Sequence, residues 1–391
     1  MRILPNSSKA RKISLALLLL LVSVALWITC IAILNKPSKA ALGRVLVLDD
    51  SDDDFRTPRF GDHVYAFPNG KIRPKVSRLN ICQTVGGFRS LSASKDGRFF
   101  LLCENVANRL TAYDTQTGAQ LWRLDGNFQS AAVSRDGLIY ALSSSGNIYG
   151  DQAFVLNQRG EIQNKAAIGG CDLVLDDERK VFWTVGAKVK KCDLALNVLW
   201  EGNLIRWCAV SVDLNPDGSV WVAERDHPTV SGSQDRLLKI SPTGQVLNDI
   251  KLDFSPLCLR VNTDGNLWVT GVKGRDSRTK RFLEWLEKRI GRVPLWKSAR
   301  LFLTKSDYWS KTEIRDSQGN LLRELAHGGH SLAIDPADSS VWLAGRKTLY
   351  QYSSAGDNLG HINGLSHSQN YVIVLPPPPK ATAQPPQPRI P

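Results

Sequence analysis

A β-hairpin of one form recurs along this 391-residue chain and sets the strongest limit on its fold. In the clearest copy, residues 210–214 alternate in polarity, Asn-Pro-Asp-Gly follows at 215–218, and Val-Trp-Val-Ala occupies 220–223. Proline fixes φ and glycine tolerates a positive φ, so the central segment predicts a tight turn between two strands. A second strand–turn–strand segment, centred on Pro-Thr-Gly, occupies 236–247. Four short antiparallel strands in about 40 residues match the size of one propeller blade.

The hairpin occurs six times with an aromatic residue in its second strand. These aromatic residues are Phe100, Tyr140, Trp183, Trp221, Trp268 and Trp342. Their spacings are 40, 43, 38, 47 and 74 residues, and the last is one period enlarged by an insertion. Residues 44–72 match a blade that lacks its first strand, and 370–375 is an orphan strand that can complete it. Joining the chain ends in this way removes free sheet edges. The sequence therefore predicts an all-β fold, a β-propeller over residues 44–375 with seven blades, six being the alternative.

The repeats also carry a resemblance to known families. Residues 215–224, followed by 238–244, resemble an NHL-type repeat and the repeats of the gluconolactonase-like and streptogramin-lyase-like propellers. The resemblance covers the repeat region as a pattern and implies the propeller fold. It leaves the activity open, because these families share blades and differ in function.

The N-terminal region predicts a membrane anchor. Residues 15–34 carry no charge and are long enough to cross a bilayer core of about 30 Å as a transmembrane helix. Residues 1–14 are basic and contain no acidic residue, so the positive-inside tendency places them in the cytoplasm and the propeller on the extracytoplasmic side. A linker, 35–43, follows. The alternative is a secreted protein, released by signal-peptide cleavage after Ala40. The length of the apolar run favours the anchor.

The longest connection predicts a helical insertion in one blade. Residues 273–311 contain 12 Lys and Arg against 4 Asp and Glu, which supplies +8 of the formal net charge of +13. Phe282 and Trp285 share the apolar stripe of a helix expected at 279–290. One interpretation is that the basic amphipathic insertion, 273–310, lies on an anionic membrane or docks a partner. The other is a lid that packs on the propeller. The charge is local, and we expect no nucleic-acid binding.

The C-terminal segment, residues 376–391, is rich in proline and cannot build a core. It is expected to be extended or disordered.

Antiparallel strands divide the connections of each blade between two faces. Connections between second and third strands, and between blades, share one face, and all the long ones fall there. We expect binding residues on these loops. The lactonase-like resemblance implies a divalent cation held by oxygen ligands, for which Asp172 and Asn370 are the candidates. The streptogramin-lyase-like resemblance implies His330 and Glu224 as catalytic residues. Further binding candidates on these loops are Arg89, Arg206, Trp207 and His327.

Two hypotheses for function follow. The first is a membrane-anchored, extracytoplasmic propeller that serves as a binding or scaffold module for a protein, glycan or small ligand on its long-loop face. The alternative is a metal-dependent lactonase or lyase. Neither ligand pattern is complete, which favours the binding module and leaves enzymatic activity open.

Six cysteines lie outside the apolar N-terminal run. They permit up to three disulfides in an oxidising compartment, or they are buried free thiols. Cys171 and Cys192 fall within one blade and are the first candidate pair.

Overall fold

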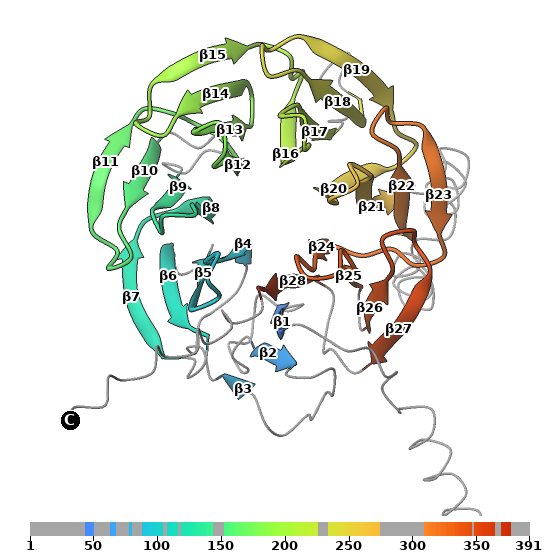
Figure 1. The fold of residues 1–391 in the computed structure, drawn as a ribbon, viewed down its shortest axis with the longest axis horizontal. Helices are drawn as coiled ribbons and strands as arrows, with labels where there is room; N and C mark the ends of the chain where they lie inside the picture. Colours follow the sequence, from blue (N-terminus) through green and yellow to red (C-terminus); the bar gives the residue numbers. More distant parts are fainter. Residues whose placement is uncertain are drawn as a thin grey trace, which may run out of the picture.

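The described strands form sheets that are arranged in a ring (Figure 1). The computed structural model describes residues 44–50, 63–67, 78–79, 88–104, 108–115, 119–143, 152–225, 234–273, 309–345, 348–363 and 369–376. Within these ranges there are seven four-stranded antiparallel sheets. Six of them are made of four consecutive strands each, and the seventh combines strands from both ends of the chain.

The strands of the six consecutive sheets are as follows. The first sheet contains β4 (Phe88–Ala93), β5 (Phe99–Glu104), β6 (Arg109–Asp114) and β7 (Gln120–Asp125). The second contains β8 (Phe128–Val133), β9 (Ile139–Ser143), β10 (Gln152–Leu156) and β11 (Ile162–Ala166). The third contains β12 (Asp172–Asp176), β13 (Val181–Val185), β14 (Val189–Asp193) and β15 (Val198–Gly202). The fourth contains β16 (Cys208–Leu214), β17 (Val220–Arg225), β18 (Arg236–Ile240) and β19 (Val246–Lys251). The fifth contains β20 (Ser255–Val261), β21 (Leu267–Lys273), β22 (Trp309–Arg315) and β23 (Leu321–Leu325). The sixth contains β24 (Ser331–Ile334), β25 (Val341–Ala344), β26 (Thr348–Tyr352) and β27 (Asn358–Asn363).

The closing sheet has the order β28–β1–β2–β3, formed by Gln369–Leu375, Arg44–Asp50, His63–Phe67 and Arg78–Leu79. β28 pairs antiparallel with β1 over seven residue pairs, from Arg44 opposite Leu375 to Asp50 opposite Gln369. The predicted joining of the orphan C-terminal strand to the N-terminal segment is therefore confirmed. Six blades consist of four consecutive strands each. The closing sheet, which combines both ends of the chain, is counted separately from these six.

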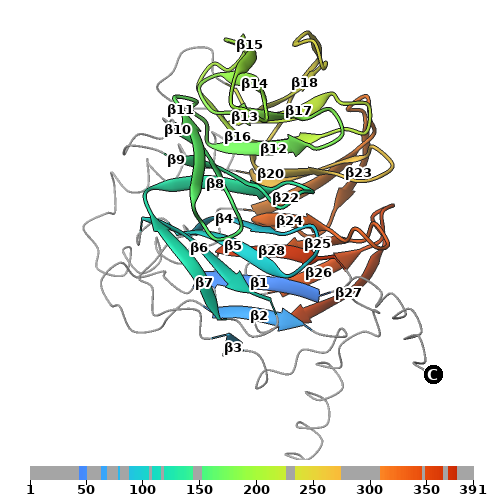
Figure 2. The ribbon, with the colours of Figure 1, turned by 60° about the vertical axis from the view of Figure 1, so that its left-hand side comes forward.

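The innermost strands complete the ring. β4, β8, β12, β16, β20, β24 and β28 each contact the next in that order, and β28 contacts β4 again. Figure 2 shows several of these inner strands lying side by side across the molecule. Because the circle of contacts is closed, side chains from different blades face one another across a common channel.

The second strand of each blade carries the core. β5 and β13 are buried along their whole length, and β17 is buried except at its last residue. The fourth strands, such as β7 and β19, consist mostly of exposed residues. Trp183, Trp221, Trp268 and Trp342 are among the largest fully buried side chains. The recurring aromatic position predicted from the sequence is thus the contact between neighbouring blades, where burying a large apolar side chain contributes most.

The turns follow the chemistry of their residues. In the Asn-Pro-Asp-Gly turn, Gly218 adopts φ +85°, and its N–H donates to the carbonyl of Asn215 over 2.9 Å. Gly244, in the Pro-Thr-Gly turn, has φ +90°. Glycine is favoured at both positions because it has no Cβ to clash in the left-handed region.

Several predictions fall outside the described residues, namely the anchor at 15–34, the helical insertion with Phe282 and Trp285, and the tail after residue 376. Within the described ranges, no helix has the length and apolar character needed to span a membrane.

Candidate functional site

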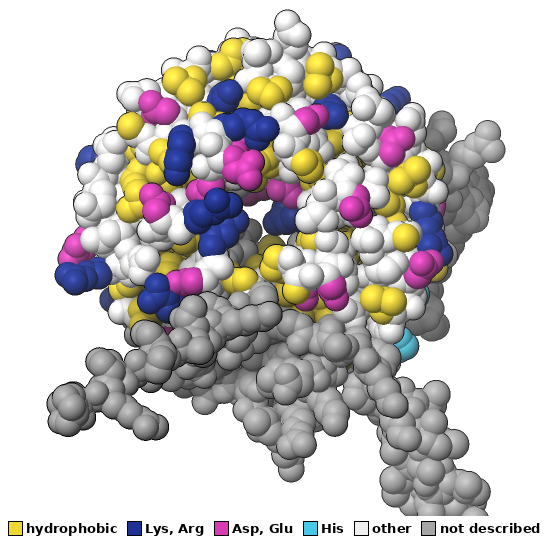
Figure 3. Space-filling view, viewed as in Figure 1, with side chains coloured by type: hydrophobic (Ala, Val, Ile, Leu, Met, Phe, Trp, Pro, Cys, Tyr) yellow, Lys and Arg dark blue, Asp and Glu magenta, His cyan; other side chains and the backbone are white. Residues whose placement is uncertain are grey.

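The central channel contains two polar cavities that share part of their lining. The larger, of about 210 Å³, lies toward the ends of the inner strands and is lined by residues that include Ser92, Lys95 and Asp213. The smaller, of about 100 Å³, lies toward their starts and is lined by residues that include Cys171 and His330. Asp172 and Arg260, together with Ser90 and Leu91, line both. Figure 3 shows the opening of the channel, with acidic and basic side chains gathered around it.

The register of the blades explains why Asp213 and Arg260 meet there. Asp213 pairs with Trp221, and Arg260 pairs with Trp268, so each lies opposite the recurring tryptophan of its own blade. The equivalent residues in four other blades are Ala93, Ala132, Val174 and Ala333. In the six sheets of consecutive strands, this position therefore carries small or apolar side chains apart from the opposite charges of Asp213 and Arg260 in neighbouring blades.

Two aspartates fasten neighbouring inner strands together. Asp172 on β12 accepts hydrogen bonds from Oγ of Ser130 (2.8 Å) and from the N–H of Val212 on β16 (3.1 Å). Asp213 on β16 accepts one from the N–H of Val261 on β20 (2.8 Å). Inner strands have an edge without a partner strand, and these carboxylates satisfy backbone donors on it. Asp172 thus joins its blade to both neighbouring blades, Asp213 joins its blade to the next one, and both aspartates line the channel.

The charges of the channel perturb one another. Burial raises the pKa of Asp172 and of Asp213, and the positive charge of Arg260 opposes that rise in both. Asp172 adds a further upward contribution to the pKa of Asp213. Two carboxyl groups and one guanidinium therefore share a half-buried space, and the charge of each affects the pKa of the others.

The channel also presents hydrogen-bond donors. Arg260 donates from Nη1 to the carbonyl of Leu259 over 2.7 Å, and its other N–H groups have no partner among the described residues. The buried Oγ of Ser92 likewise has none within the described part of the chain. Because buried polar groups are normally paired, the Ser92 hydroxyl points to a site that a polar ligand or water can complete, and Arg260 offers further donors beside it.

Two of the predicted site residues meet in this channel. His330 and Asp172 both line the smaller cavity. The N–H of His330 donates to the carbonyl of Ala344, which fixes its backbone at the start of β24. Asp213 and Arg260 were not among the candidates, although a charged residue within an apolar inner strand was a signal that could have found them.

Glu224 lies elsewhere and is fully buried. Its Oε1 accepts hydrogen bonds from the backbone N–H groups of Arg206 (2.6 Å) and Trp207 (2.9 Å), and its Oε2 accepts one from Nε of Arg236 (2.7 Å). Glu104 occupies the equivalent position and binds Arg109 in the same cross-strand manner. The Glu–Arg pair therefore recurs in two blades. In addition, the two backbone hydrogen bonds show that Glu224 holds the loop before β16 in place.

His327 lies apart from His330. Its ring stacks on Tyr350, with centroids 4.1 Å apart, and its Nδ1 is 2.8 Å from the hydroxyl oxygen of Tyr352. Burial, reinforced by His361, lowers the pKa of His327. This histidine packs on the third strand of its blade and is not among the residues that line the two channel cavities.

The other binding candidates are dispersed. Arg206 is exposed and Trp207 is half-buried, in the loop that Glu224 fastens. Arg89 belongs to β4 and Asn370 to β28, and only their backbones are described. Asn370 pairs with Asp49 of β1.

The cysteines are arranged differently from the sequence expectation. Cys171 lies with its Sγ 3.7 Å from Sγ of Cys208 in the next blade. Cys192 is fully buried, where it pairs with Phe182 and packs in a core cluster that includes Leu173. None of the three forms a disulfide in the described part of the chain.

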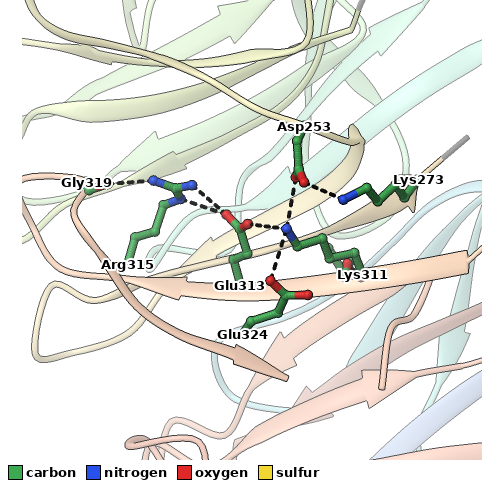
Figure 4. Close-up of polar contacts among 8 residues, drawn as sticks. Asp253, Lys273, Lys311, Glu313, Arg315, Gly319 and Glu324 are labelled. Atoms are coloured by element: carbon green, nitrogen blue, oxygen red, sulfur yellow. Dashed lines mark hydrogen bonds and ion pairs between the residues drawn. The ribbon is translucent and has the colours of Figure 1, made fainter. Parts of the chain in front are cut away.

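An ionic network marks the two ends of the long connection in the fifth sheet (Figure 4). Nζ of Lys311 lies 2.9 Å from Asp253, 2.8 Å from Glu313 and 3.2 Å from Glu324. Burial disfavours the ammonium group, but hydrogen bonds to these carboxylates outweigh it and raise the pKa of Lys311. Lys273, at the other end, also binds Asp253. The residues at the two ends of the connection, Lys273 and Lys311, are therefore held together through their shared ion pairs with Asp253.

A metal ion needs a set of ligand side chains that lie close together. Within the described ranges, no three His, Cys, Asp or Glu side chains come close enough together to hold a metal ion.

Comparisons with known proteins support the fold. No protein-family model matches the chain, and no curated protein matches it by sequence. Among solved structures, hydrazine synthase of Kuenenia stuttgartiensis superposes with a TM-score of 0.53 at 15% identity. The match covers 68% of this chain and 77% of that chain. At this identity the likeness shows the β-propeller fold, and it does not extend to the NHL, gluconolactonase-like or streptogramin-lyase-like families.

Proposed function

We propose that this protein is a membrane-anchored, extracytoplasmic β-propeller that binds a small, hydroxyl-rich ligand in its central channel. The observation that carries the proposal is the adjacent pair Asp213 and Arg260 on the wall of the larger cavity. A carboxylate accepts hydrogen bonds from ligand hydroxyls, and a guanidinium donates them. Serine hydroxyls around the pair extend the polar surface.

The size and charge of the channel define the ligand class. A cavity of about 210 Å³ is smaller than the ~300–1,000 Å³ typical of sites for drug-sized molecules, which favours one small ligand or one unit of a glycan. Two acidic residues, Asp172 and Asp213, and two basic residues, Arg260 and Lys95, line this cavity, so the formal charges of the lining balance. A neutral polyhydroxylated ligand suits such a lining better than a strongly charged one, because neither set of charges is left unpaired.

Calorimetric titration of the full-length protein in detergent with D-glucose and D-gluconate tests the proposal. We expect saturable binding of glucose, and weaker binding of gluconate because of its carboxylate. Arg260→Gln and Asp213→Asn should each weaken glucose binding by roughly tenfold or more, since a hydrogen bond to a charged group contributes about 1.5–3 kcal/mol.

Asp217→Asn is the matched control for these variants. Its side chain is 60% exposed on the turn after β16, so glucose affinity should be unchanged. If the wild-type protein binds neither sugar at millimolar concentration, or if the control weakens binding as much as Asp213→Asn, the channel is not the site.

The membrane part of the proposal is carried by the apolar run at 15–34 and the basic residues before it. Protease added outside intact cells or spheroplasts should digest the propeller while the protein sediments with membranes. A mature N-terminus after Ala40 would instead support the secreted alternative.

A further inference from the structure

Two thiols from neighbouring blades face each other at the starts of the inner strands. Cys171 immediately precedes β12, and Cys208 is the first residue of β16. Their Sγ atoms are 3.7 Å apart. A disulfide requires about 2.0 Å, so the two side chains together need to move by less than roughly 2 Å to form one.

The backbone fixes both cysteines to one short segment. The N–H of Cys171 donates to the carbonyl of Val185 (2.5 Å), and the N–H of Ala209, next to Cys208, donates to the carbonyl of Gly186 (3.0 Å). Gly186 also permits close approach, because a Cβ at this position would lie 3.2 Å from Cα of Gly170. Two consecutive carbonyl groups thus position both thiols, so their proximity does not depend on side-chain rotamers alone.

We propose that Cys171 and Cys208 form a reversible disulfide that links the third and fourth sheets of the propeller. The proposal goes beyond ligand binding and does not rest on it. Extracytoplasmic compartments are oxidising, which would favour the linked form there.

The reaction is a thiol–disulfide exchange with a low-molecular-weight disulfide such as oxidised glutathione. Cys171 is the more exposed thiol. It loses its proton and attacks one glutathione sulfur, which breaks that disulfide and releases one glutathione thiolate. The thiolate of Cys208 then attacks Sγ of Cys171, forms the internal disulfide and releases the second glutathione. The two cysteines lose two electrons and two protons, and one molecule of oxidised glutathione accepts them and becomes two molecules of reduced glutathione.

The electrostatics of Cys208 differ between the two steps. In the dithiol, its hydrogen bond with Cys171 lowers the pKa of the Cys208 thiol, although burial opposes this, and the positive charge of Arg225 lowers it further. That hydrogen bond is lost once Cys171 is bound to glutathione, so Arg225 is the group that still favours the Cys208 thiolate in the second step. A metal-bound pair is the other common arrangement for two close thiols. It needs further ligands, and within the described residues no third His, Cys, Asp or Glu completes such a group.

The location gives the disulfide a consequence for the channel. Cys171 lines the smaller cavity beside Asp172, which fastens β12 to β16. A covalent link at this point would hold the same two blades together at the channel wall.

Peptide mapping of the full-length protein tests the proposal without any ligand. The protein is equilibrated in buffers of increasing oxidised-to-reduced glutathione ratio, alkylated and digested with trypsin. Trypsin places Cys171, Cys192 and Cys208 in the separate peptides 166–179, 192–206 and 207–225. We expect a cross-linked pair of 166–179 with 207–225, and alkylation of both cysteines to fall together as the ratio rises. Reductant should restore both.

Cys171→Ser should abolish the cross-linked pair, and Cys208→Ala should do the same. Cys192→Ser is the matched control from the same blade and should leave the pair intact. Linkage of 166–179 to 192–206, or full alkylation of both cysteines at the most oxidising ratio, would overturn the proposal. Either result can occur whether or not the channel binds glucose.

Discussion

Glu224 provides the sharpest test of how this propeller is held together. The carboxylate is fully buried and binds two backbone N–H groups and Nε of Arg236. We predict that Glu224→Gln lowers stability, because glutamine keeps the shape and one acceptor oxygen but removes the charge that faces a guanidinium only 5% exposed.

The magnitude follows from the partners that remain. Removing one member of a buried ion pair costs about 3–5 kcal/mol. Arg236 keeps an ion pair with Asp249 (2.6 Å) and a hydrogen bond to the carbonyl of Leu204 (2.7 Å), so we expect the lower end, about 3 kcal/mol. Unfolding entropy is about 2.1 cal/mol/K per residue, or about 0.7 kcal/mol/K for the roughly 330 residues of the propeller. The expected fall in melting temperature is therefore about 4 °C.

Circular dichroism melting of the full-length protein measures this shift, and Asp249→Asn is the control. Asp249 binds the same arginine, but its side chain is 44% exposed, so its loss should cost less than about 1 kcal/mol and about 1 °C. If Glu224→Gln melts no lower than Asp249→Asn, the buried pair does not stabilise the loop before β16. A stable Glu224→Gln variant that has lost glucose binding would support the prediction that Glu224 is a site residue.

Two further predictions concern the channel and the turns. Burial raises the pKa of Asp213 above its ordinary value of 3.8, so wild-type stability should fall as pH rises through the interval from that value to the raised one. Asp213→Asn removes this loss, and its melting temperature relative to wild type should therefore be higher at pH 7 than at pH 4, whereas a constant difference would show that the carboxyl titrates normally. Gly244→Ala should destabilise by more than about 1 kcal/mol in urea unfolding, because its Cβ would lie 2.1 Å from Cε2 of Trp200 at φ +90°. Gly265→Ala isolates the cost of the backbone, since φ is also positive there but the nearest atom, Cβ of Ser317, is 3.6 Å away; equal effects of the two variants would contradict the predicted clash.

Much of the fold was predictable because its determinants are local. Alternating polarity specifies a strand whose two faces differ, and a glycine at a positive φ specifies where the strand turns back. The period of the aromatic residues then gives the blade. The orphan strand near Leu375 predicted the closure with β1, because an unpaired strand needs a partner for its backbone groups.

The candidate site was predicted less well, because its members come from different blades. Reasoning from loops placed the site on the long-loop face. The structure places the larger cavity toward the other end of the inner strands, where Asp213 and Arg260 line it. Glu224 and His330 are both polar residues on the expected face, yet one is enclosed within its blade and the other lines the channel.

The sequence alone determined the repeat, the strands and the way the ring closes, since each depends on neighbours in the chain or on a simple need to pair edges. Only the tertiary structure decided that Cys171 meets Cys208 and that Asp213 lies beside Arg260. Those neighbours depend on how far each blade stands from the axis and how adjacent sheets are rotated. The side chains packed between blades determine this distance and this rotation, and neither can be calculated from the spacing of residues along the chain.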